Sequence, residues 1–139
     1  MTRRRHRISS EHGQTAVEFA LVAPFIVVLL LAVIQFGIAF HNYVTITDAA
    51  RAGARKAIVA RFAAGNFDEA KQAVRDSASN LDQTTLNQPG AIDVSAAGGL
   101  TSGSLVTVTV KYPYTISIPL LGMTVSSGTL TAVAKERME

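Results

Sequence analysis

The chain has 139 residues and no cysteine, which excludes disulfides and thiolate metal sites. Hydrophobic residues make up 48% of it, and most of this excess lies in one run between Ala16 and Phe40. The net charge is +3, and the first 13 residues carry all of it. A basic leader on a neutral body favours orientation in a membrane over nucleic-acid binding, so we expect no nucleic-acid partner.

The apolar run predicts a membrane-spanning helix. Ala16 to Phe40 is 25 residues, which rise about 37 Å as an α-helix and exceed the ~30 Å hydrocarbon core of a bilayer. A cleavable secretory signal has a shorter apolar region of about 7 to 15 residues. We therefore expect a basic leader at 1–13 and a transmembrane helix at 14–40. Pro24 is expected to kink that helix.

The remainder, residues 41–139, is expected to form a small domain outside the cytoplasm. Arg3, Arg4, Arg5 and Arg7 precede the span and predict a cytoplasmic N-terminus. The proline-free, alanine-rich segment at 41–64 predicts that the helix continues beyond the membrane, with Gly65 as its stop. Within it, small residues recur every four positions, which either lets another helix approach closely or simply favours helix formation. These residues are Ala49, Gly53 and Ala57.

A second, short helix is predicted at 66–81, with one apolar face, and a loop at 82–90. From Ala91 the hydrophobic period changes to two, which indicates antiparallel strands. Strands are expected at 91–97, 104–112 and 129–136. Pro113 and Pro119 bracket 114–118, which is expected to be an edge strand or an extended loop. The predicted fold class is α+β: a long helix, a short helix, and a small antiparallel sheet that the upper part of the long helix covers.

No catalytic constellation is visible in the sequence. His6, His12 and His41 are scattered without metal-ligand spacing, and no nucleophile elbow, phosphate loop or paired-carboxylate motif occurs. We therefore expect no enzyme activity, no metal and no cofactor.

The stretch GQTAVEF places a carboxylate, Glu18, at the upstream edge of the apolar run. One interpretation is an interfacial carboxylate within reach of water. The other begins with cleavage after Gly13, which would give Gln14 a cationic α-amine at neutral pH. Glu18 would then lie one helical turn from that amine and could pair with the amine of its own chain or of a neighbour.

The region from Gly13 to Lys56 resembles the TadE-like pseudopilins of the Tad (Flp-type) pilus, which are related to type IV pilins. The similarity consists of the basic leader, Gly13, the Glu18-Phe19 pair and a span containing Pro24. It continues through Phe36-Gly37 near the end of the apolar run and through the Ala-, Arg- and Gly-containing helix that follows. One departure is Gln14, where typical pilins carry phenylalanine.

The resemblance implies that a prepilin peptidase cleaves between Gly13 and Gln14. It implies that Glu18, beside Phe19, aids assembly by countering the amine of an adjacent subunit. The chain would be a minor pseudopilin, held first in the inner membrane and then placed in a filament or at the cell surface, for adhesion or secretion. Its partners would be other pilins, platform proteins and the peptidase. The alternative is a permanent single-pass anchor that carries a small extracytoplasmic binding domain.

Overall fold

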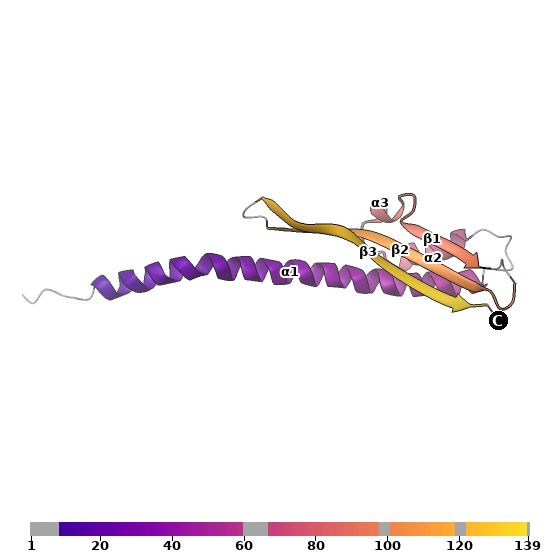
Figure 1. Cartoon of the computed structure of the whole chain (residues 1–139), viewed down its shortest axis with the longest axis horizontal. Helices are drawn as coiled ribbons and strands as arrows, with labels where there is room; N and C mark the ends of the chain where they lie inside the picture. The colour runs from indigo at the N-terminus through magenta and orange to yellow at the C-terminus, as the bar shows by residue number, and fades with distance from the viewer. Residues whose placement is uncertain (1–8, 60–66, 98–100, 119–121, 139) are drawn as a thin grey trace, which may run out of the picture.

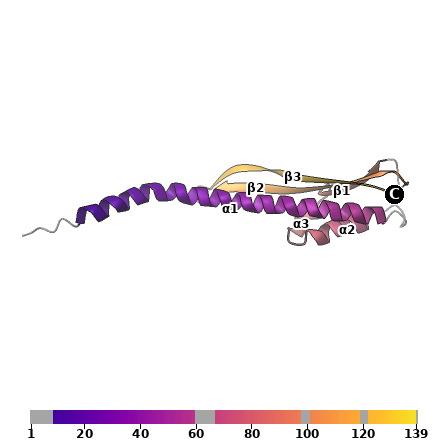
Figure 2. The same cartoon turned by 90° about the horizontal axis from the view of Figure 1, so that it is seen from below.

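The computed structural model describes residues 9–59, 67–97, 101–118 and 122–138. Its largest element is α1 (Ser9–Val59), a continuous helix of 51 residues that is about 76 Å long at 1.5 Å per residue. Helix α1 passes through Pro24 without a break. Figure 2 shows a gentle bend in its indigo, N-terminal part. The predicted continuation to residue 64 is seen as far as Val59, and the rest lies outside the described residues.

Two short helices follow, α2 (Asp68–Ser77) and α3 (Gln83–Leu86). The prediction of a loop at 82–90 was wrong, because α3 forms one helical turn there. Asp82 caps it: its carboxylate accepts a hydrogen bond from the backbone N–H of Thr84 at 3.0 Å and one from the hydroxyl of Thr85 at 2.6 Å. A four-residue helix is too short to show a hydrophobic period.

The sheet has three antiparallel strands in the order β1 (Ile92–Ala97), β2 (Leu105–Ile118) and β3 (Met123–Arg137). Strand β2 runs on past Pro113 and includes residues 114–118, so of the two predicted alternatives the edge strand is observed and the extended loop is not. Strand β1 pairs with β2 no further than Val110. Beyond that point no other described strand pairs with this edge of β2, and a proline is tolerated at such an edge. Strand β3 is longer than the predicted 129–136.

The core lies between the C-terminal half of α1 and one face of the sheet. Figure 2 shows the sheet along one side of this half and α2 with α3 along another. The alternation predicted for β2 is confirmed, since Val106, Val108 and Val110 are fully buried, whereas Thr107 and Thr109 are only partly buried. The predicted cover is also confirmed: residues of α1 belong to the same buried cluster, namely Ile46, Ala49, Ala50, Ala54 and Ala57. The α+β fold class is therefore confirmed.

Candidate functional site

The predicted processing and assembly residues lie together near the N-terminal end of α1. Gly13, Gln14, Glu18 and Phe19 are all exposed, and the side chain of Phe19 is 69% exposed. The amide Nε2 of Gln14 donates a hydrogen bond to Oε1 of Glu18 at 3.1 Å. Residues 14 and 18 therefore share one face of the helix, one turn apart.

Helix α1 begins at Ser9, so the Gly13–Gln14 bond lies within its first turns. A Cβ added at Gly13 would meet nothing within 4 Å. A protease that binds its substrate as extended backbone could cleave this bond only after the first turns of α1 unwind. Helix ends fray more easily than helix interiors, and this bond is close to an end.

Most of the apolar part of α1 has no cover within the described chain. Gly13–Val59 is long and apolar enough to cross a membrane, and none of its most apolar stretch is buried by other described residues. Pro24 is exposed within it. An uncovered apolar surface of this extent needs either lipid or other protein chains around it.

The small-residue stripe lies about 46 Å along the helix from Glu18, at 1.5 Å per residue. Ala49 and Ala57 are fully buried. A Cβ placed on Gly53 would lie 2.5 Å from Cγ2 of Val74 and 3.2 Å from the carbonyl oxygen of Ala70. Helix α2 therefore lies against α1 at a separation that leaves no room for a side chain at Gly53.

Gln35 was not singled out from the sequence, yet it joins two distant parts of the fold. Its side-chain carbonyl accepts a hydrogen bond from the N–H of Ser117 at 2.6 Å. Its amide donates to the carbonyl oxygen of the same residue. Gln35 thus pairs with the backbone of β2 as another strand would. The only sequence signal was a polar side chain inside an apolar run.

Concave surfaces flank these elements, and two of them differ clearly in character. One is an apolar groove of about 280 Å³ between α1 and the β2–β3 hairpin, and its walls include Phe36, Phe40, Tyr43 and Tyr114. The other is a polar recess of about 460 Å³ beside α2 and α3.

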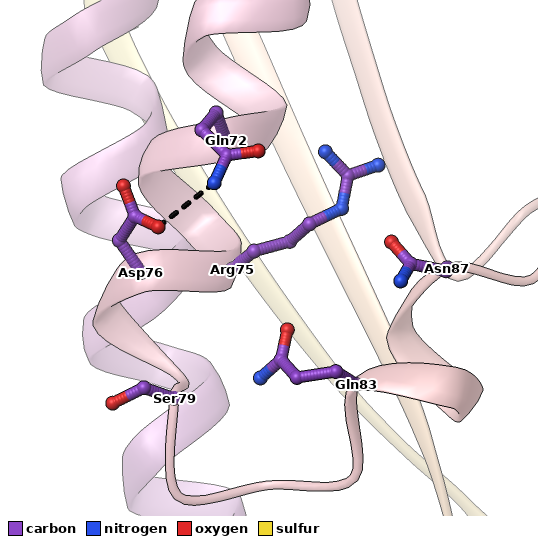
Figure 3. A pocket seen from close by; sticks show the side chains of 6 residues that line it. All are labelled: Gln72, Arg75, Asp76, Ser79, Gln83 and Asn87. Carbon is purple, nitrogen blue, oxygen red and sulfur yellow. Dashed lines mark hydrogen bonds between the residues drawn. The ribbon is translucent and has the colours of Figure 1, made fainter.

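In the polar recess, Arg75 extends from α2 toward Asn87 while Gln72 donates to Asp76 at 2.9 Å (Figure 3). The nitrogen Nε of Arg75 is buried without a partner among the described residues. No histidine lines the recess. Its groups are suited to hydrogen bonding with a polar surface. Among the described residues, no cluster of three potential metal ligands occurs.

This architecture is that of an α+β protein whose N-terminal helix is a candidate membrane anchor. Residues 13–55 match the family model of TadE-like protein, somewhat under a third of the chain. The chain is therefore similar to TadE-like proteins over the segment on which the predicted resemblance was based, and that prediction is confirmed. The similarity associates the chain with Tad pilus-related machinery, and this family is a structural one. Searches of curated proteins and of solved structures gave no match.

Proposed function

We propose that this chain is a minor pseudopilin, a non-enzymatic structural subunit needed to assemble a Tad-type pilus or a related secretion machine. The observation that carries the proposal is a coincidence of two features. The segment that matches the TadE-like family, residues 13–55, contains the uncovered apolar stretch of α1. In the precursor this stretch anchors the chain in the inner membrane, with the basic leader in the cytoplasm. In the assembly it packs among the helices of other pilins.

Processing is the first step of the proposed pathway. A prepilin peptidase removes residues 1–13 and leaves an α-amine on Gln14. Gln14 and Glu18 already face each other across one turn, so the new amine forms close to a carboxylate. In an apolar environment each charge is costly alone and is stabilised by the other. Pairing between adjacent subunits would then set their register.

The N-terminus of the protein recovered from membranes or sheared filaments, read by mass spectrometry, tests this proposal. We expect it to begin at Gln14, and we expect Gly13→Ala to leave the leader attached. Gly37→Ala is a matched control, because it makes the same change in the same helix and also meets nothing within 4 Å. It should be processed normally. A wild-type chain that retains its leader in cells with an active peptidase would favour the permanent anchor instead.

A further inference from the structure

Charge is distributed unevenly along two elements that lie side by side. No Asp, Glu, Lys or Arg occurs in α1 between Glu18 and Asp48, and none occurs between Lys111 and Lys135. The second stretch includes the distal hairpin, defined here as Tyr112–Ser117 of β2 and Thr124–Leu130 of β3. Figures 1 and 2 both show this end of the β2–β3 hairpin running along α1 toward its N-terminus, beyond β1 and α2.

The distal hairpin is held at a defined height on the helix. Two hydrogen bonds join Gln35 of α1 to the backbone of Ser117 near the end of the hairpin. They fix the position of this end along the helix axis, beside Gln35. On the adjoining surface, Tyr114 and Ile116 face Phe36 and Phe40 across the apolar groove. Within the hairpin, the Tyr114 ring covers Gly128, where a Cβ would lie 2.9 Å from Cε1. The hairpin end is therefore fixed to α1 by polar and apolar contacts.

The point of attachment, Gln35, lies within the apolar run Ala16–Phe40. Gln35 comes five residues before Phe40, which is about 7.5 Å along the helix axis. The headgroup layer on each side of a bilayer is about 5 to 8 Å thick. The remaining stretch, Ala16 to Ile34, has 19 residues and spans about 28 Å, close to the ~30 Å hydrocarbon core. Gln35 thus lies where hydrocarbon would give way to headgroups.

The hairpin has the chemistry of that layer. Beyond β1, one edge of β2 has no neighbour among the described strands, and β3 is an edge strand of the described sheet. Unpaired strand edges are not tolerated in hydrocarbon, but headgroups and water can satisfy them. Tyr114 is of a residue type enriched at membrane interfaces. Without Lys or Arg, the hairpin has no means of attracting anionic lipids over neutral ones.

We propose that the end of the distal hairpin at Ser117 and Thr124 is a second membrane contact, lying in the outer headgroup layer, and that Gln35 marks the outer limit of the hydrocarbon-spanning part of α1. The proposal rests on the proposed function only in requiring that α1 spans a membrane. Its partner is the surface of a neutral lipid bilayer.

Single-cysteine labelling tests this proposal, because the chain contains no cysteine of its own. Full-length Val125→Cys, Val133→Cys and Ile26→Cys variants would each carry an environment-sensitive fluorophore in phosphatidylcholine vesicles. Val125 and Val133 are a matched pair: both are valines of β3, and they are 62% and 54% exposed. They lie about 26 Å apart at ~3.3 Å per strand residue. Ile26 is at mid-span.

We expect a quencher attached to lipid headgroups to reduce emission from the label at position 125, with a blue shift. Only an aqueous quencher should affect the label at 133. The proposal would be overturned if the label at 125 were quenched only from the aqueous phase, like the label at 133, while the label at 26 was quenched from the acyl chains. That result would still support α1 as a membrane anchor. A label at 125 shielded from both quenchers would lie in the hydrocarbon if it is quenched from the acyl chains, and under protein if it is not; either outcome also overturns the proposal. An aqueous environment at 26 would refute the membrane span itself.

The role of the two hydrogen bonds between Gln35 and Ser117 can be tested with Gln35→Leu in the chain labelled at position 125. This variant keeps the helix and lengthens the apolar run, but removes both hydrogen bonds to Ser117. We expect the label to lose contact with the headgroup quencher as the hairpin end leaves the helix. Unchanged quenching would show that Gln35 does not set the height of the hairpin.

Discussion

Gly53 offers a sharp test of how closely α2 packs on α1, because two physical effects predict opposite signs. Alanine is favoured over glycine inside a helix by about 1 kcal/mol. On helix propensity alone, Gly53→Ala would therefore stabilise the protein. The structure predicts the reverse, because the new methyl group has no free volume to enter.

The size of the clash follows from the distances. The added Cβ would lie 2.5 Å from Cγ2 of Val74, which is 0.9 Å less than the 3.4 Å at which ordinary contact begins. Valine has a stiff χ1 and cannot swing its methyl group away cheaply. Overpacking of a well-packed core costs about 1 to 3 kcal/mol. After the gain in helix propensity, we expect the free energy of unfolding to fall by about 1 kcal/mol.

The assay is urea unfolding of the full-length protein in a mild detergent, followed by the fluorescence of its three tyrosines in a chain without tryptophan. A double-mutant cycle isolates the contact. Val74→Ala alone should destabilise by about 2 kcal/mol through lost burial and a cavity. Adding Gly53→Ala to that variant should then be neutral or stabilising. If Gly53→Ala stabilises the wild type, or costs the same in both backgrounds, the close packing described here is incorrect.

Two further predictions concern carboxylates. Glu18→Gln keeps an acceptor for Gln14 but removes the charge, so we expect normal cleavage and loss of incorporation into sheared filaments; equal incorporation would show that hydrogen bonding suffices. Hydrogen bonds from Thr84 and then Thr85 lower the pKa of Asp82 from its usual 3.8. Because the pKa of Asp82 is lower in the folded state than in the unfolded state, its ionised carboxylate stabilises the protein at pH values above the unfolded-state pKa. This contribution is lost as the pH falls through the folded-state pKa. Asp82→Ala should therefore lower the Tm at neutral pH and have little effect well below pH 3.8. An equal fall in Tm at both pH values would exclude a stabilising role for the ionised carboxylate of Asp82 at the start of α3.

The sequence was sufficient for features that repeat along the chain. The period of two predicted the buried face at Val106, Val108 and Val110, because each position repeats the same environment. The spacing of Ala49, Gly53 and Ala57 marked a surface open to close approach. It did not identify α2 as the neighbour, since spacing on one helix says nothing about what packs there.

Features that depend on one distant contact could not be predicted in this way. The strand-like pairing of Gln35 with Ser117 joins residues 82 positions apart, and a lone glutamine in an apolar run carries no sign of its partner. Similarly, β2 continues through Pro113 because β1 stops pairing at Val110. The prolines alone left an edge strand and an extended loop as alternatives, and the free edge that permits the strand arises from the sheet.

The same contact changes how the end of the apolar run is understood. Apolarity alone set the limit of the predicted membrane segment at Phe40, which made the segment several ångströms longer than a hydrocarbon core requires. In the structure, Phe36 and Phe40 are walls of the groove that Tyr114 of the hairpin also lines. On the proposed depth, these last apolar residues of the run serve the contact between helix and hairpin. On that proposal, the nineteen residues from Ala16 to Ile34 would cross the hydrocarbon. The apolar run would then perform two tasks in sequence, first spanning the membrane and then docking the domain at its surface.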